Sequence, residues 1–207
     1  MQPQQIFSRC NIGLGIAIAV LGLLVYPVCN AEDSHKADAA EKLLQALPAS
    51  KMSLADGIQQ AAKTGDAPIS AKFEFDDHGK LSLSVYTAEK GLTVAPEKNI
   101  LKELSGSPEQ ATWKPEVEVF KDAEHLTRAS QQLTLMSHSP NSLLEIVNKA
   151  QTRAPGNAFS ITPGTFKGIP VAMVELAVKG SVVELLYNLN NGDLAGGTPP
   201  YGSREDD

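Results

Sequence analysis

The chain has 207 residues, of which 42% are hydrophobic and 20% charged, as in folded globular proteins of one ordinary domain or two small ones. Its 24 acidic residues outnumber the 18 basic ones, and the formal net charge is −6. No basic patch stands out, which argues against nucleic acid and against anionic membrane surfaces as partners.

The N-terminus has the pattern of a secretory signal. Residues 12–26, "IGLGIAIAVLGLLVY", are uncharged and rich in apolar side chains, and "VCNAED" follows Pro27. The apolar run is shorter than the roughly 20 residues that a membrane-spanning helix needs. We therefore predict a signal peptide over residues 1–31 with cleavage after Ala31, and a periplasmic or secreted mature protein without a membrane span. The alternative is an uncleaved N-terminal anchor.

Both cysteines, Cys10 and Cys29, fall within the predicted signal peptide. Lipidation of Cys29 is not expected, because a lipobox has a small residue just before the cysteine, and Val28 stands there. The mature chain then has neither a disulfide nor a cysteine nucleophile, although an oxidising compartment would permit disulfides.

Residues 32–50 form a polar leader with a short helix over 39–47 that Pro48 ends. A first unit is predicted over residues 51–120. It begins with a helix for which Ser53 is the N-cap and Asp56 completes a near capping box. Alternating apolar residues in "ISAKFEF" and "KLSLSVYT" then predict a β-hairpin that turns at "DDHG".

The middle of the chain is more varied. "GLTVA" predicts a short strand, "PEKNILKELSG" a helical piece over 96–106, and "PEVEVF" a strand appended to the first unit. Apolar residues then recur at helical spacing over 122–138, which predicts an amphipathic linking helix within residues 121–140.

A second unit is predicted over residues 141–195. It has a helix that ends at Pro155-Gly156, a strand over 157–162, and two long strands around Lys179-Gly180. Residues 196–207 are predicted to be a disordered tail.

The stretch "GSVVELLYNLNNGDL" raises the question of a calcium loop. Its apolar side chains recur every second residue up to Leu189, which is typical of a strand with one buried face. A calcium loop uses several spaced carboxylates, whereas Asp193 is the one acid nearby beyond Glu184. Residues 190–193 are therefore predicted to form a turn, which Gly192 favours.

The two units repeat one plan of helix, strand and strand. Ser53 aligns with Ser142, and Val85 aligns with Val174. Repeated units stack when neither buries enough apolar surface alone. We therefore predict one cooperative body, with the linking helix packed between the units.

The second unit, closing with "PVAMVELAVKGSVVELLYNLNNGDL", resembles the PepSY module. That module ends in two antiparallel strands and an Asp-x-x-x-Gly type of turn before a last apolar residue. Asn188 stands at the Asp position, Gly192 and Leu194 match the close, and Pro170 stands where an aromatic residue is frequent. The resemblance covers residues 141–195 and, more faintly, 52–90. It implies small non-catalytic α+β domains of the cell envelope, often in tandem, that are proposed to inhibit or regulate peptidases.

The sequence contains no nucleophile elbow, phosphate loop or zinc-binding motif. The histidines are scattered as His35, His78, His125 and His138. His78 lies beside Asp76 and Asp77, but such turn residues are usually solvated rather than bound to a metal. No catalytic, cofactor-binding or metal-binding residue is therefore predicted, and the binding residues are left unassigned.

Two further features have competing interpretations. Glu116 and Glu118 share one face of a strand and could serve acid–base chemistry, but alternation with valines favours a solvent-facing edge. Trp113 could anchor a partner, but a core position is favoured.

Together these patterns predict an α+β fold with two PepSY-like units, each packing its helices on one face of an antiparallel sheet. The opposite face is predicted to be wet or to meet a partner, and it bears Lys72, Glu74, Ser82, Ser84, Glu175 and Glu184. The predicted function is that of a non-catalytic binding protein of the envelope, whose partner is another envelope protein such as a peptidase. The alternative is a periplasmic carrier or sensor of a small ligand.

Overall fold

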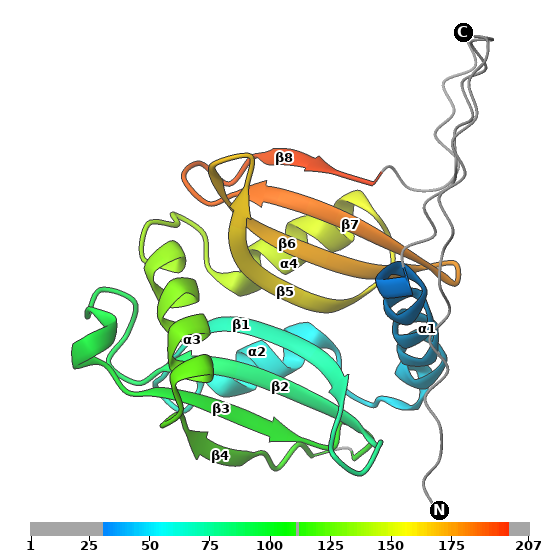
Figure 1. Cartoon of the computed structure of the whole chain (residues 1–207), viewed down its shortest axis with the longest axis horizontal. Coiled ribbons are helices and arrows are strands. Elements are labelled where there is room, and N and C mark those ends of the chain that lie inside the picture. Colours follow the sequence, from blue (N-terminus) through cyan, green and yellow to red (C-terminus); the bar gives the residue numbers. More distant parts are fainter. Residues whose placement is uncertain (1–30, 111, 199–207) are drawn as a thin grey trace, which may run out of the picture.

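The computed structural model describes residues 31–110 and 112–198 (Figure 1). The predicted signal peptide, apart from Ala31, and the predicted tail from residue 199 lie outside this range. The helices are α1 (Ala31–Ala46), α2 (Leu54–Ala62), α3 (Ala123–Met136) and α4 (Leu143–Arg153), with short 3₁₀ helices η1 (Leu47–Ala49) and η2 (Pro96–Lys98). The strands are β1 (Ala67–Phe75), β2 (Leu81–Ala88), β3 (Leu101–Gly106), β4 (Glu116–Val119), β5 (Asn157–Phe166), β6 (Ile169–Val178), β7 (Ser181–Asn188) and β8 (Leu194–Gly197).

The strands form one antiparallel sheet in the order β4-β3-β2-β1-β5-β6-β7-β8. The predicted α+β class is confirmed. Each predicted unit contributes one half of the sheet, and the halves join where β1 pairs with β5. The two units therefore share a continuous hydrogen-bonded sheet.

The two halves are related by an approximate two-fold axis at this junction. The junction pairs Ala71 with Ile161, two residues that hold the same place in their own hairpins, since Ala71 faces Val85 and Ile161 faces Val174. A register shift occurs at the same level in each hairpin, between Pro68 and Ser70 and between residues 158 and 160. The repeat seen in the sequence thus extends to the irregularities of the strands.

Helices α2 and α4 begin with the same capping box. The Ser53 hydroxyl accepts the Asp56 amide at 3.1 Å, and the Asp56 carboxylate accepts the Ser53 amide at 3.0 Å. Ser142 and Glu145 make the equivalent bonds at 3.3 and 2.7 Å. Each cap satisfies amides that the first helical turn leaves unpaired, which is worth about 1 kcal/mol.

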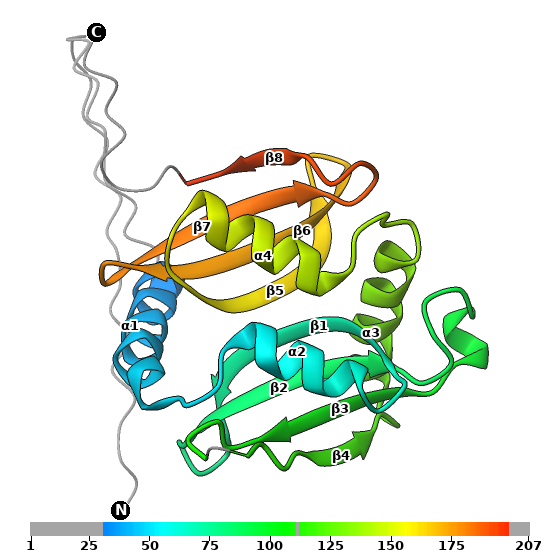
Figure 2. The same ribbon diagram turned by 180° about the vertical axis from the view of Figure 1, so that it is seen from behind.

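Both capped helices cover the same face of the sheet, as Figure 2 shows from behind. They bury Leu54, Ile58, Ile146 and Val147 against strand residues such as Val85. This layer is the main hydrophobic core.

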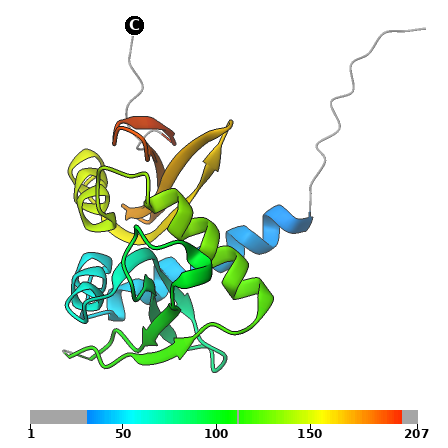
Figure 3. The same ribbon diagram turned by 90° about the vertical axis from the view of Figure 1, so that its left-hand side faces the viewer.

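The predicted linking helix is confirmed as α3, which crosses the opposite face of the sheet (Figure 1). Its residues Ala129 and Leu133 form a second cluster with Ile69, Tyr86 and Phe120. Figure 3 shows α1 on this same side, projecting away from the sheet. Leu43, Leu44 and Leu47, from the C-terminal end of α1 and from η1, belong to the main core or pack against it.

The predicted strand at 91–95 and the predicted helix over 96–106 are wrong. Residues 91–99 form a loop that contains η2, and the Asn99 side chain holds this loop by donating to the carbonyls of Gly91 and Val94 at 2.9 and 3.2 Å. The following residues form β3, in which Leu101 and Leu104 lie on opposite faces of the sheet and join different apolar clusters. Pairing with β2 therefore overrides the local helical spacing.

The start of the predicted tail is also wrong. Leu194–Gly197 pairs with β7 as strand β8, and the Thr198 amide donates to the Glu184 carbonyl at 2.8 Å. A Cβ at Gly197 would lie 2.3 Å from that carbonyl oxygen. Glycine is therefore required here for close backbone approach, although a glycine-rich sequence is also typical of disorder.

Candidate functional site

We call the sheet surface opposite α2 and α4 the open face; α3 and α1 lie on its side of the sheet (Figure 3). Directly opposed residues of neighbouring strands form a polar row across it. From β7 to β4 the row reads Glu184, Glu175, Ser160, Lys72, Ser84, Ser105 and Glu116. The row crosses the junction between the two units, so that neither unit holds it alone.

The open face carries a concentration of carboxylates. Glu175 lies directly opposite Glu184 on β6 and β7, and Glu103 lies directly opposite Glu118 on β3 and β4. Glu74 adds a further acid on β1 and forms an ion pair with Lys72. Like charges at directly opposed positions destabilise a sheet, by up to about 1 kcal/mol a pair. Each unit therefore contains one such unfavourable pair.

The environment of Glu175 and Glu103 favours the neutral form of these two side chains. Burial raises the pKa of Glu175 above its usual value, and the charge of Glu184 adds to this, against an opposing hydrogen bond from Ser160. Burial also raises the pKa of Glu103. The charges of Glu74 and Glu118 add to this, against a hydrogen bond from Ser84 and the charge of Lys72. A cationic partner would relieve the electrostatic repulsion within both glutamate pairs.

The pairs of glutamates lead to a prediction about pH. The raised folded pKa of Glu175 means that the native state binds this proton more tightly than the unfolded state, in which glutamate titrates near about pH 4.3. The contribution of the group to stability is thus greatest below that value and falls as pH rises through the folded pKa. Glu175→Gln should raise the free energy of unfolding at neutral pH by about 0.2–1 kcal/mol. In urea titrations, this gain should shrink towards pH 4.

Glu145 offers a control of opposite sign. The Ser142 amide lowers its pKa, so the contribution of Glu145 is present at neutral pH and is lost as pH falls through its folded pKa. Glu145→Gln should therefore destabilise the protein at neutral pH. If the Glu175→Gln protein were less stable than wild type at neutral pH, this would contradict the prediction that Glu175 and Glu184 repel each other in the folded protein.

The open face matches the sequence prediction in part. Lys72, Glu74, Glu175 and Glu184 are partly exposed, as predicted. Ser82 and Ser84 are buried, at 7% and 1% exposure, so the prediction of a wet position is wrong for both. Their short side chains lie among longer neighbours. The sequence pattern predicts a helix over 96–106 and therefore does not place Glu103 on this face, whereas the structure places it in β3.

The remaining polar motifs have structural roles. Asp76 accepts the amides of His78 and Lys80 at 2.9 and 2.8 Å, which closes the hairpin turn. Residues 190–193 form the predicted turn, in which the Asn188 side chain accepts the Asn190 amide at 2.8 Å. Within residues 31–110 and 112–198, no group of three or more metal-ligating side chains has metal-binding geometry.

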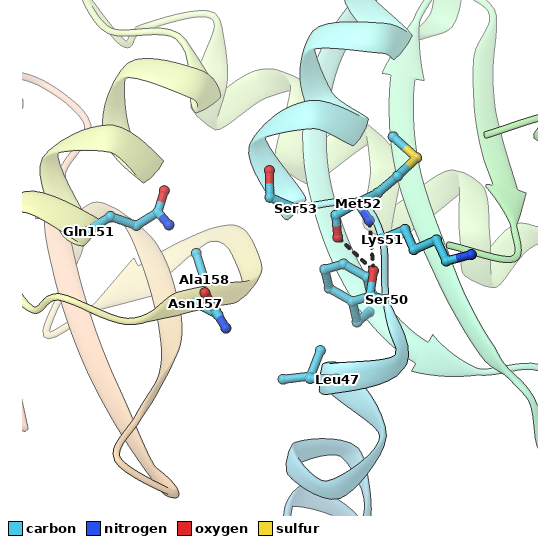
Figure 4. A pocket seen from close by; sticks show the side chains of 9 residues that line it. Leu47, Ser50, Lys51, Met52, Ser53, Gln151, Asn157 and Ala158 are labelled. Carbon is cyan, nitrogen blue, oxygen red and sulfur yellow. Dashed lines mark hydrogen bonds between the residues drawn. The ribbon is translucent and has the colours of Figure 1, made fainter. Parts of the chain in front are cut away.

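Clefts occur between the two units in the described part of the chain. One, of about 370 Å³, is lined mainly by apolar side chains of α2, α4 and the end of α3, among them Ile58, Leu143 and Met136. A smaller cleft of about 230 Å³ lies where the segment after α1 meets the second unit (Figure 4). There Leu47 and Ser50 face Gln151, Asn157 and Ala158 across the gap.

Comparisons with known proteins leave the family open. No protein-family model matches the chain, and no curated protein matches it. Among solved structures, a chain described as a "putative lipoprotein" of Clostridium difficile 630 is similar, with 10% identity and a TM-score of 0.37. The alignment covers 72% of this chain and 93% of the other. Similarity at this level assigns neither a family nor a function.

No helix in the described part of the chain is both long enough and apolar enough to cross a lipid bilayer. The apolar run at residues 12–26 lies outside the described part of the chain.

Proposed function

We propose that this is a secreted, non-catalytic binding protein of the cell envelope, built from two PepSY-like units. Its binding surface is the open face, and its partner is another envelope protein that presents a basic surface. The signal-like N-terminus supports the location, and the PepSY resemblance makes a peptidase the partner class to test first. In this proposal the protein inhibits or regulates that peptidase.

The observation that carries the proposal is the pair of opposed glutamates in each unit. Cross-strand positions normally hold neutral or oppositely charged residues, because like charges there cost stability. An unfavourable arrangement that occurs in both halves is typical of a binding surface rather than of a structural one. Complementary charge on a partner would offset the cost and would speed association.

The test is affinity capture from an envelope extract with the mature protein as bait. The double variant Glu175→Gln/Glu184→Gln removes two charges from the open face. Because it relieves repulsion, it should fold at least as well as wild type. We expect it to retain at least tenfold less of the specific partner, equivalent to about 1.4 kcal/mol. The purified partner is then assayed for peptide hydrolysis, which added wild-type protein should reduce.

A matched control is Glu97→Gln/Glu109→Gln, which removes the same charge from exposed positions in η2 and in the loop after β3. It should capture the partner as wild type does. Equal capture by both double variants, or the absence of a specific partner at low salt, would contradict the proposed function. A partner without peptidase activity would contradict the peptidase assignment alone.

The apolar cleft between α2 and α4 favours a second candidate function, the carriage or sensing of a small apolar ligand. Its volume of about 370 Å³ falls within the range of small-molecule sites. Ala62 lines this cleft and is itself exposed, so Ala62→Trp should fill it without disturbing the core. If the Ala62→Trp variant still captures the partner, the partner binds at the open face. If the variant no longer binds an apolar fluorescent probe, the probe binds in the cleft.

A further inference from the structure

Among the described residues, strand β4 forms one edge of the sheet and pairs with β3 alone (Figure 1). All four of its residues are exposed, and Val117 and Val119 retain 60% and 42% of their accessible surface. An edge strand presents unpaired backbone groups that can pair with another chain. The apolar side chains of β4 are therefore presented together with backbone donors and acceptors that have no partner strand within residues 31–110 and 112–198.

The direction of these backbone groups follows from the hydrogen bonds to β3. The Phe120 amide donates to the Leu101 carbonyl at 3.0 Å, so residue 120 points its backbone groups inward. Because this direction alternates along a strand, Glu118 and Glu116 also point inward, and Val119 and Val117 point their amides and carbonyls outward. The outer edge thus offers two consecutive pairing positions.

The two faces of β4 differ in chemistry, because its glutamates and its valines point to opposite faces of the sheet. Glu116 and Glu118 lie on the open face, beside Ser105 and Glu103 of β3. Val117 lies on the opposite face, beside the buried Leu104. A strand added here would place alternate side chains next to carboxylates and next to exposed valines.

A second copy of this chain is a poor occupant of the edge. Two β4 strands paired antiparallel would bring their glutamates together on one face, which repeats the repulsion already present within each unit. Lys or Arg side chains would instead meet the carboxylates of Glu116 and Glu118.

We infer that the β4 edge binds an extended segment of a partner protein in which Lys or Arg alternates with β-branched apolar residues. The segment adds to the sheet as a ninth strand, with its basic side chains on the open face and its apolar ones beside Val117 and Val119. This inference rests on the proposed function, because it names how the partner reaches the acidic open face.

The test uses the full mature protein and three capped synthetic octapeptides. One alternates Lys with Val, one has the same composition with four Lys followed by four Val, and one alternates Glu with Val. Binding is measured by fluorescence anisotropy at low salt and again at physiological salt. We expect the alternating Lys peptide to bind at least tenfold more tightly than the other two, and binding to weaken as salt rises.

Two variants of the protein test the geometry. Val117→Pro removes an outward amide but no bond to β3, so the sheet should persist while peptide affinity falls at least tenfold. Val117→Ala keeps the amide and should lose less affinity. Glu116→Lys/Glu118→Lys should reverse the preference, so that the alternating Glu peptide binds and the Lys peptide does not.

The outcomes separate this inference from the proposed function. If peptide affinity is unchanged by Val117→Pro and by the charge reversal, the edge assignment is overturned, whatever the capture experiment shows. If the peptide results hold and no envelope partner is captured, the edge assignment stands and the proposed function fails. Equal affinity for the alternating and block peptides would also overturn the inference, because it would indicate charge attraction without strand pairing.

Discussion

Replacing Trp113 with alanine is expected to lower the free energy of unfolding by about 3–5 kcal/mol. This is a large share of the total free energy of unfolding of a typical domain. Trp113 is only 1% exposed and belongs to the main core, which confirms the predicted core position over a partner anchor. Its indole N–H donates to the Gly106 carbonyl at 3.2 Å, and its own carbonyl accepts the Gln60 side chain at 2.8 Å. The residue thereby attaches the segment before β4 to α2.

Urea unfolding followed by circular dichroism measures this loss, since the variant has no tryptophan to report fluorescence. Trp113→Phe is the matched control, because it keeps an aromatic ring and loses the indole donor, and it should cost clearly less than alanine. Val117→Ala, on the exposed edge, should change stability by no more than about 0.5 kcal/mol. A Trp113→Ala protein as stable as Val117→Ala would show that the indole does not hold the core together.

The second large effect is expected when the two halves of the sheet are separated. A fragment of residues 139–198 has roughly 60 residues, a marginal size for an independent domain. Without the first unit, β5 becomes an unpaired edge, the fully buried Ile161 loses its neighbour Ala71, and α4 loses its contact with α2. We expect this fragment to lack a cooperative thermal transition, whereas the mature chain should unfold in a single one.

Complementation in trans provides the control for this experiment. Mixing the fragment with residues 32–138 should restore a cooperative transition, because the β1–β5 junction and the α2–α4 contact can re-form between chains. Two transitions in the intact protein, with the isolated fragment reproducing one of them, would instead establish two independent modules.

Many local elements could be predicted from the sequence because their cause is local. The serine and acid of each capping box lie three residues apart, and buried apolar residues recur at every second position in parts of β6 and β7, as at Val183, Leu185 and Tyr187. The amphipathic pattern of α3 was equally readable. In these segments the periodicity of burial coincides with the periodicity of the backbone, so pattern and structure agree.

The sequence-based predictions are wrong for β3 and β8, two segments whose conformation depends on pairing with another strand. Leu101 and Leu104 have helical spacing, yet β3 is a strand because β2 offers it a full ladder of partners. Gly196 and Gly197 are typical of a tail, yet they lie in β8, which pairs with β7 and brings Gly197 close to the backbone of Glu184. In both places the local preference is weak, and backbone hydrogen bonds to another segment outweigh it.

The amino-acid sequence alone was sufficient for the α+β class, the internal repeat, the capped helices, the core position of Trp113 and the acidic character of the chain. The tertiary structure decided how the units join and where the acids meet. Ser160 and Lys72 become neighbours only because β1 pairs with β5, and Glu103 faces Glu118 only because β3 is a strand. The reason is that side chains far apart in the chain share a surface only through strand register, and register depends on long-range pairing that a single sequence pattern does not encode.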